Sequence, residues 1–329
     1  MLGLYNSVDR TTLAAWQTAT GQDATSLNTD PLFINPTGDA VAVSLHVQPG
    51  SPANNGGTPI SGLTTDYDGQ ARSVTFPDIG ADEVISNNAN LSALVLSSGA
   101  LTPAFSGAAT SYTATVSNAT TALTATPTLA DANATVTVNG AAVPSGSASG
   151  AINLNVGSST INVDVTAQDL TTTKTYTVTV TRLSVFQEWA AANGVTNDPQ
   201  MPGANGIGNL LNFAFGVDPV TGGSGALVFN GTFGAGGTIG TTGQPITMLE
   251  PTANGVDFRA LFVRRRDFAA AGLTYKPQFS ASMASWTDSA VVPTVLADDG
   301  ANQIVSVPYP PFIGGKKARF FRISVSMAP

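Results

Sequence analysis

The chain has 329 residues, of which 42% are hydrophobic and only 10% are charged, with 34 glycines, 20 prolines and no cysteine. This length predicts about two domains, and the composition is typical of an extended, secreted β-protein rather than of a cytosolic enzyme. The absence of cysteine excludes disulfides and thiolate metal sites.

The net charge of −8 lies in the first half of the chain. Residues 1–182 hold four basic and twelve acidic residues, whereas residues 183–329 hold nine of each sign. An acidic front half argues against a nucleic-acid partner. No apolar run reaches the roughly 18 residues of a membrane-spanning helix. The first residues lack the features of a signal peptide, so if the protein is exported we expect a leader upstream of Met1.

Residues 1–88 alternate short apolar pieces, at 32–34 and 41–47, with turns rich in proline, glycine and asparagine. The motifs in order are Asp30-Pro-Leu-Phe33, Gln48-Pro-Gly-Ser-Pro-Ala53, Asp66-Tyr-Asp-Gly-Gln-Ala-Arg72 and Asp78-Ile-Gly-Ala81. This series resembles the C-terminal end of secreted right-handed parallel β-helix proteins, the pectate-lyase-like fold. The resemblance implies that residues 1–88 are the terminal coils and cap of a parallel β-helix.

A β-helix coil buries its apolar face only against neighbouring coils. This segment has room for about two coils, so its first coil has an open edge, and open edges invite pairing. We therefore expect upstream β-helix coils or a neighbouring protomer as partner of this N-terminal edge. In the isolated chain, residues 1–30 are expected to be poorly ordered or packed on such a partner.

The acidic turn at 66–72 is the first candidate metal site. Asp66 and Asp68 echo a calcium loop, but the remaining ligands, including a bidentate glutamate, are missing. The preferred interpretation is an Asx-turn in which Arg72 pairs with Asp66, Asp68 or Asp78. Calcium at Asp66 and Asp68 stays the alternative, and no other cofactor is expected.

His46 is the only histidine of the chain and alternates with Leu45 and Val47 on a predicted strand. This position predicts an outward-facing side chain. A lone histidine without a carboxylate near it in the sequence is weak evidence for a base or a metal ligand. The pair Asp82-Glu83 is interpreted as the exit corner of the first block.

Three stretches within residues 91–182 alternate strictly between apolar and polar side chains, at 111–117, 160–166 and 174–181. Tyr112, Ala114 and Val116 form one row, and the same period of two recurs at 160–166 and 174–181. This period is the mark of half-buried antiparallel strands, and the threonines of the other row suit a solvated sheet face.

Two further stretches frame this alternation, Leu91-Ser-Ala-Leu-Val-Leu-Ser-Ser-Gly99 at its start and Lys174-Thr-Tyr-Thr-Val-Thr-Val-Thr-Arg182 at its end. With them, the segment resembles the bacterial cadherin-like β-sandwich family. The resemblance implies an accessory spacer domain over residues 89–182 without catalytic residues. Asp131, Asp164 and Asp169 are too scattered for the calcium clusters of true cadherins.

Residues 183–329 begin with two helix signatures. Ser184 and Gln187 form a capping box, and a second helix is predicted over 207–215 with Gly216 as its stop. Strands are predicted at 226–230, 256–264, 273–280, 290–296, 303–307 and 318–326, and a flexible, glycine- and threonine-rich hairpin connection at 231–243. The pattern from Phe186 to Pro219 resembles a C-terminal module of large bacterial exported proteins, which implies a β-sandwich after two short helices.

The module usually carries an acidic calcium loop before its second helix, whereas this chain has Gly203-Ala-Asn-Gly206 there. A hard cation needs several carboxylate oxygens. We therefore expect calcium binding at this loop to be lost or weak.

The main basic concentration consists of Arg264, Arg265, Arg266, Lys316 and Lys317. One interpretation is a solvated strand end whose charges are balanced by nearby aspartates. The other is a contact patch for the acidic front half of a neighbouring chain or for an anionic polysaccharide.

The sequence thus predicts a mostly β protein of three blocks, at 1–88, 89–182 and 183–329, located outside the cell or on its surface. It offers no catalytic or cofactor-binding cluster. We expect a non-catalytic structural or adhesive portion of a bacterial protein, with head-to-tail self-assembly as a further hypothesis. The alternatives are an accessory tail of a polysaccharide-active β-helix enzyme and a carbohydrate-binding module that uses the aromatic residues Trp16, Tyr67, Trp286 and Tyr309.

Overall fold

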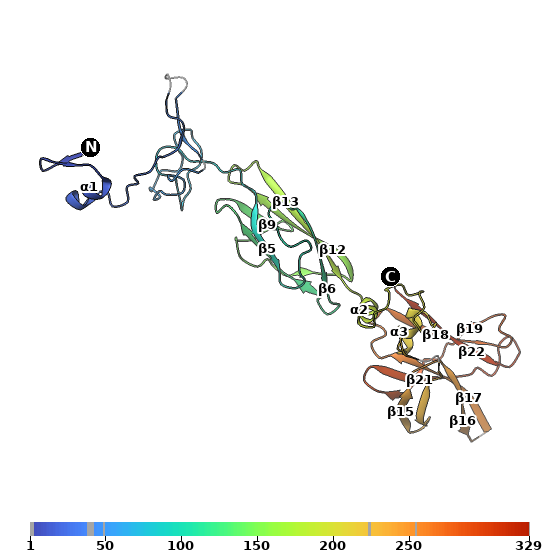
Figure 1. The fold of residues 1–329 in the computed structure, drawn as a ribbon. Coiled ribbons are helices and arrows are strands. Elements are labelled where there is room, and N and C mark those ends of the chain that lie inside the picture. The colour runs from blue at the N-terminus through green and yellow to red at the C-terminus, as the bar shows by residue number, and fades with distance from the viewer. Residues whose placement is uncertain (1–2, 38–42, 49, 223–224, 254, 329) are drawn as a thin grey trace.

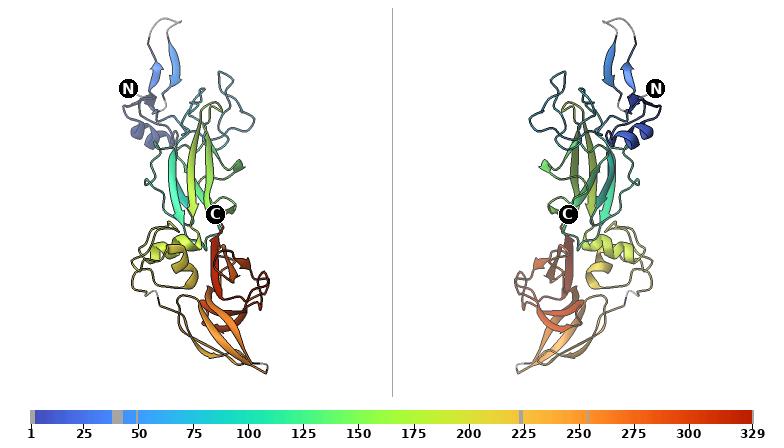
Figure 2. Two further views of the ribbon diagram at one scale, coloured as in Figure 1. Left: turned by 90° about the vertical axis from the view of Figure 1, so that its right-hand side faces the viewer. Right: turned by 90° about the vertical axis from the view of Figure 1, so that its left-hand side faces the viewer.

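The computed structural model describes residues 3–37, 43–48, 50–222, 225–253 and 255–328. The described chain is mostly β, with three short helices, and its parts follow one another from the N-terminal hairpin to the C-terminal sheets (Figure 1). The turned views of Figure 2 show the same order, with the long strands of a sandwich between the first part and the C-terminal sheets.

The first part contains two hairpins. β1 (Gly3–Tyr5) pairs antiparallel with β2 (Val8–Arg10), and α1 (Leu13–Thr20), capped by the Thr12 side chain, follows. β3 (Phe33–Asn35) pairs antiparallel with β4 (Ser44–Val47). Every named strand in the described part of residues 1–88 therefore pairs antiparallel, and the expected parallel β-helix is not confirmed. Residues 41 and 42 of the expected apolar piece lie outside the described residues.

Few side chains of this first part are buried. Ile34 and Leu45 on the β3–β4 hairpin are each 59% exposed. Half of the buried residues are polar or charged; the buried set in the described part of 1–88 is Val47, Ser51, Ala53, Pro77, Asp78 and Glu83. So little apolar burial cannot offset the entropy of ordering this segment, and polar contacts have to supply the rest. The expectation that residues 1–30 are poorly ordered or packed on a partner stays a prediction. Residues 3–20 form the hairpin and the helix, while residues 1 and 2 lie outside the described residues.

The middle part is a sandwich of two layers. One layer is a five-stranded sheet with the order β10 (Ala141–Ala142), β9 (Thr135–Val138), β12 (Gly157–Thr166), β13 (Thr173–Arg182) and β6 (Ser111–Val116). The other layer holds two strand pairs, β5 (Leu91–Leu96) with β8 (Ala125–Leu129) and β7 (Ala122–Leu123) with β11 (Ile152–Asn153). β12 and β13 pair antiparallel at ten positions, and β6 joins β13 in parallel.

The predicted alternation places the core of the sandwich correctly. Its inward row is almost completely buried; the row comprises Tyr112, Ala114, Val116, Ile161, Val163, Val165, Tyr176, Val178 and Val180. The threonines between them lie on the outer face of the five-stranded sheet, where the pleat suits a β-branched side chain. The sequence pattern therefore determines which face of each strand forms the core.

The C-terminal part begins with the two predicted helices, α2 (Val185–Ala192) and α3 (Asn209–Phe215), and the capping box of Ser184 and Gln187 is formed. Two sheets follow. The four-stranded sheet has the order β16 (Ile246–Thr252), β17 (Gly255–Arg265), β21 (Asn302–Pro308), β20 (Thr294–Asp298). The three-stranded sheet has the order β19 (Thr287–Asp288), β18 (Leu273–Ser280), β22 (Phe320–Met327). Phe262 and Val305 of the first sheet share a core with Phe279 of the second, which makes the expected C-terminal sandwich.

The segment 231–243, expected to be a flexible hairpin connection, itself contains a strand of a hairpin. β14 (Val228–Thr232) pairs with β15 (Gly236–Thr241). The two strands approach so closely that a Cβ atom on Gly231 would stand 2.5 Å from the Cα atom of Gly237. Glycine is depleted in strands, so the very residues that permit this close pairing predicted a loop. β16 was not predicted either.

The middle and C-terminal parts are joined by hydrogen bonds as well as by the chain. Leu183 is the one residue between the end of β13 and the N-cap of α2, and its amide donates to the Val116 carbonyl at 3.0 Å. The Asn118 amide donates to Glu188 Oε1 on α2 at 2.5 Å. Asn118 Nδ2 donates to the Leu183 carbonyl at 2.9 Å. The junction is thus tied through three separate bonds.

Tyr176 gives a test of the sandwich core, because its buried hydroxyl accepts from the Leu91 amide at 3.0 Å and donates to the Gly107 carbonyl at 2.9 Å. Tyr176→Phe leaves the buried Leu91 amide without its partner, and we expect a loss of about 1–3 kcal/mol in the free energy of unfolding of the sandwich. Urea unfolding followed by hydrogen exchange over residues 91–182 measures it. Tyr67→Phe, at a side chain that is 85% exposed, is the control and should change stability by less than about 0.5 kcal/mol. Equal stability of both variants would contradict this account of the core.

Candidate functional site

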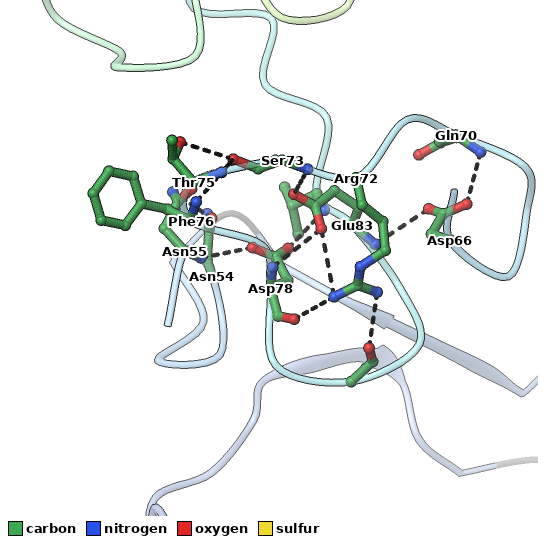
Figure 3. Close-up of polar contacts among 12 residues, drawn as sticks. Asn54, Asn55, Asp66, Gln70, Arg72, Ser73, Thr75, Phe76, Asp78 and Glu83 are labelled. Carbon is green, nitrogen blue, oxygen red and sulfur yellow. Dashed lines mark hydrogen bonds and ion pairs between the residues drawn. The ribbon is translucent and has the colours of Figure 1, made fainter. Parts of the chain in front are cut away.

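A buried ion pair holds the strand-poor segment 50–85 together (Figure 3). The side chains of Arg72 and Glu83 are 8% and 1% exposed, and Arg72 Nη2 lies 3.7 Å from Glu83 Oε2. The same guanidinium donates to the carbonyls of Asp78 at 2.6 Å and Gly80 at 2.9 Å. The Glu83 carboxylate accepts from the amides of Ser73 at 3.0 Å and Asp78 at 3.1 Å. Both charges are paired and hydrogen-bonded, as burial requires.

Asp78 extends this network to the neighbouring turns. Its carboxylate accepts from the amide of Asn55 at 2.6 Å and from the amide of Val84 at 2.7 Å. The expected pairing of Arg72 is corrected here: the carboxylate partner of Arg72 is Glu83, and Asp78 meets it through the main-chain carbonyl. Glu83 is therefore the centre of a structural network. Of the pair Asp82-Glu83, Asp82 is the residue that makes its contacts outside this network.

Asp66 forms the expected Asx-turn. Its Oδ1 accepts from the amides of Asp68 at 2.9 Å and Gln70 at 2.7 Å, and its Oδ2 accepts from the amide of Glu83 at 3.2 Å. Both oxygens thus serve the backbone, which is the role of aspartate in a turn. Calcium takes six to eight oxygen ligands, and Asp66 has little free capacity to supply one.

His46 lies among carboxylates that are distant in the sequence. Its Nδ1 is 2.9 Å from Asp82 Oδ1 and 3.4 Å from Asp68 Oδ2. The side chain is 46% exposed, so the outward orientation expected for it is observed. The hydrogen bond to Asp82 and the charges of Asp82, Asp68 and Asp66, acting against a small desolvation effect, raise the pKa of His46 above its ordinary value of 6.5.

The sequence contains no local sign of this cluster. Asp82 follows His46 by 36 positions, and no metal-ligand spacing links the two. The contact arises because Asp82 Oδ2 accepts the Val47 amide at 2.9 Å, next to His46 on β4. The order of the motifs in the first block was the one available signal, since it places the turn at 66–72 and the corner at 82–83 in the same terminal region.

The five basic residues belong to two different sheets. Arg264, Arg265 and Arg266 lie at or just after the end of β17 that pairs with Gln303 and Asn302, in the four-stranded sheet. Lys316 and Lys317 precede the start of β22, in the three-stranded sheet.

The arginines also have local partners. Arg265 donates to both carboxylate oxygens of Asp267 at 2.8 and 2.9 Å, and Arg266 lies 3.7 Å from Asp298. Arg264 stacks over Phe268 at 4.7 Å. These contacts agree with the interpretation of a balanced strand end. The contact role of the five residues stays a prediction.

The loop at 203–206 is filled by amide groups. Asn205 donates to Asn212 Oδ1 at 2.9 Å and to the Asp218 carbonyl at 3.2 Å, and its own side-chain oxygen accepts from the Ile207 amide at 3.0 Å. Asp218 turns its carboxylate to Thr221 instead, and these hydrogen bonds lower the pKa of Asp218. The loop offers amides where a calcium loop has carboxylates, and lost or weak calcium binding at this loop stays a prediction.

An apolar hollow of about 510 Å³ lies between α3 and β22. Leu211, Phe215, Phe321 and Ile323 form much of its lining, and Arg322 is the one ionisable residue among the lining residues of the described chain.

The aromatic side chains proposed for carbohydrate contact differ in their surroundings. The guanidinium of Arg322 stacks over Trp286 at 4.5 Å from the ring centre. The indole Nε1 of Trp16 donates to Asp23 Oδ2 at 2.6 Å. Tyr309 packs against Phe279 at 4.8 Å. Tyr67 is the exposed one of the four.

The two-layered sheets of residues 91–182, closed over one apolar core, define a β-sandwich domain. Residues 91–183 match the family model described as the cadherin-like β-sandwich domain, and this segment is accordingly such a domain. The match covers less than half of the chain. The assignments of the first part to a β-helix and of the last part to an exported C-terminal module stay predictions.

One relative is a protein of Evansella cellulosilytica named "Putative membrane protein". It is 45% identical over 97 residues, which are 30% of this chain and 14% of that protein. A crystal structure of a "putative glycoside hydrolase" from Bacteroides thetaiotaomicron aligns over 75% of this chain and 91% of its own, with 12% identity and a TM-score of 0.21. That similarity is too low to support an argument about fold or activity.

Among the described residues, no helix is both long enough and apolar enough to span a membrane.

Glu83→Gln tests the buried network. The substitution leaves Arg72 without its charged partner, and losing one member of a buried pair costs about 3–5 kcal/mol. We expect faster hydrogen exchange throughout residues 50–85 and unchanged exchange in the sandwich. Glu250→Gln is the matched control, because Glu250 pairs with Arg259 nearer the surface and should contribute about 0–1 kcal/mol. Unchanged exchange over 50–85 would show that the network is not what orders this segment.

The pKa of His46 gives a second test at this site. We expect NMR titration of the single histidine to give a pKa above 6.5 in the folded chain, and Asp82→Asn to lower it towards that value. Because folding raises this pKa, the pair stabilises the fold fully below pH 6.5, and the contribution is lost as the pH rises through the raised pKa. Asp257→Asn, in the C-terminal sheet, is the control. An equal His46 pKa in the parent and in Asp82→Asn would contradict the assigned cause.

Proposed function

We propose that this chain is a non-catalytic structural and adhesive portion of an extracellular or cell-surface bacterial protein, in which the cadherin-like domain is a spacer. The observation that carries the proposal is the cadherin-like sandwich at 91–183, bonded to its neighbours at both ends. A spacer transmits a position from one end to the other, so it needs a continuous core and fixed junctions.

The sandwich meets the first need. Its apolar row forms one cluster from Ala89 to Val180, and the outer row of the five-stranded sheet is threonine, serine and asparagine. The carboxylates of Asp164 and Asp169 accept hydrogen bonds from Thr175 and Thr172 on their own hairpin. Side chains used in this way support the shape and solubility of the sandwich.

Both junctions meet the second need. On the N-terminal side, the Ser86 amide donates to Gln168 Oε1 at 3.0 Å and the Ser86 carbonyl accepts from the Asp169 amide at 3.2 Å. On the C-terminal side, Leu183 and Glu188 tie β6 and its following turn to the start of α2. Bonds of this kind restrict bending of each neighbour relative to the sandwich.

The attachment point in this proposal is the N-terminal block. Its hairpins expose large apolar side chains, among them Leu4, Val8, Ile34 and Leu45, and exposed apolar surface of this kind is typical of surfaces that a partner covers. Upstream coils of a β-helix or a neighbouring protomer are the partners that we propose. The unpaired edges of β1 to β4 would accept either one by strand addition.

Head-to-tail self-assembly of the chain is the more specific form of the proposed structural role. The front half carries the whole net charge, and Lys316 and Lys317 are exposed near the start of β22. An acidic surface on one end and lysines on the other end favour heterologous contacts, which propagate if they do not close. Such association should weaken as salt is added.

One assay, on anionic and neutral polysaccharides, distinguishes this proposal from its two alternatives, a polysaccharide-active enzyme and a carbohydrate-binding module. Release of new reducing ends by the chain alone would overturn the non-catalytic proposal in favour of an enzyme. Binding without cleavage, lost in Tyr67→Ala, would favour a carbohydrate-binding module, because Tyr67 is the exposed aromatic side chain among the four candidates.

The spacer role itself predicts a rigid C-terminal junction. Inserting Gly-Gly-Ser between Leu183 and Ser184 uncouples β13 from α2, and we expect small-angle X-ray scattering to show a shorter mean extension and a more flexible particle. The same insertion after Gly146, in an exposed turn of the sandwich, is the control and should leave the scattering unchanged. If both insertions scatter like the parent chain, the junction is not rigid and the spacer role loses its basis.

A further inference from the structure

Three side chains from separate segments turn their donor atoms towards one point. His46 lies on β4, Asp68 in the Asx-turn, and Asp82 beside the buried Glu83. The Nδ1 atom of His46 and one carboxylate oxygen each of Asp68 and Asp82 all lie within 4.8 Å of one another.

Other bonds hold these ligands in place without using the three donor atoms. The second oxygen of Asp82 accepts the Val47 amide at 2.9 Å. The Asp68 amide is held by Asp66 Oδ1 at 2.9 Å. Asp66 in turn accepts the Glu83 amide at 3.2 Å, and Glu83 belongs to the buried network. Ligands oriented by a surrounding shell of hydrogen bonds are typical of metal sites.

We propose that His46 Nδ1, Asp68 Oδ2 and Asp82 Oδ1 form a binding site for a divalent transition-metal ion of the zinc class, which fastens β4 to the turn at 66–72 and the corner at 82–83. An imidazole nitrogen with carboxylate oxygens suits such ions. Calcium takes six to eight oxygen ligands, so it fits this donor set poorly.

The spacing of the donors supports the proposal. Two ligands at about 2.0–2.1 Å from a tetrahedral ion stand roughly 3.3 Å apart. The distances from His46 Nδ1 are 2.9 Å to Asp82 Oδ1 and 3.4 Å to Asp68 Oδ2, both close to this spacing, and the two carboxylate oxygens lie within 4.8 Å of each other. The three side chains are 46%, 35% and 17% exposed for His46, Asp68 and Asp82, which leaves access for a water molecule as the fourth ligand.

The site lies where an ion has the largest structural effect. Residues 43–85 are ordered by polar contacts with very little apolar burial. An ion that binds the folded segment and not the unfolded one stabilises it by mass action, and suppresses its opening about 100-fold at a concentration of 100 times the Kd. The ion would thus do for this block what a disulfide does in other small secreted domains.

The chain has one histidine, which makes the test specific. Zinc chloride is titrated at pH 7.5 into the untagged full chain, freed of metal and labelled with ¹⁵N-histidine. We expect the single imidazole signal to change with one equivalent of zinc, calorimetry to give one site, and hydrogen exchange over 43–48 and 66–83 to slow down. Calcium chloride should leave the imidazole signal unchanged.

Variants identify the ligands. Asp82→Asn and Asp68→Asn should each weaken zinc binding at least tenfold, whereas Asp257→Asn should bind like the parent. Asp68→Asn is the safer variant, because among the described residues the Asp68 carboxylate contacts only His46. An unchanged imidazole signal, or parent-like zinc binding in both variants, would overturn the site. Zinc binding without slower exchange would overturn its role as a fastener.

Discussion

The pairing of β12 with β13 is the constraint on which the rest of the molecule depends. These two strands stay in register at ten positions and carry the central buried rows of the sandwich. β13 also continues through Leu183 into the cap of α2, while the turn after β12 supplies Gln168 and Asp169 to the N-terminal junction. A register shift of one residue would turn the buried row of the shifted strand to solvent and displace the junction that this strand supports. One strand pair therefore fixes the core and the attachment of both neighbours.

The N-terminal block is ordered by a different kind of interaction. In the sandwich, each buried side chain adds roughly similar apolar burial, and the loss of one leaves many others. Between 50 and 85, the buried groups are few, and Arg72, Asp78 and Glu83 each satisfy several backbone groups. Such a network is strong when complete and costly when one member is missing. The block has therefore little redundancy, and its stability should depend on a handful of side chains.

The sequence-based predictions were more accurate for the apolar core of the sandwich than for the polar network of the N-terminal block. The buried rows that contain Tyr112, Ile161 and Tyr176 were predictable, because alternation between neighbouring residues directly indicates which face of a strand is buried. The capping box at Ser184 was predictable for the same reason. The contacts of Arg72 with Glu83 and of His46 with Asp82 were not, because they join residues whose separation carries no periodicity. The strand β15 was missed because its glycines predict a connecting loop when taken one at a time.

The difference between the sandwich and the N-terminal block also bears on where a binding partner would change the structure. A cadherin-like sandwich with a redundant core and tied ends changes little when something binds to it, which suits a spacer. The N-terminal block has exposed apolar side chains, unpaired strand edges and a sparse polar network. Its conformation should therefore respond to whatever completes it, because few internal contacts oppose a rearrangement. The proposed attachment at the N-terminal block and the proposed spacing by the sandwich would both follow from one sequence property, the uneven distribution of apolar alternation along the chain.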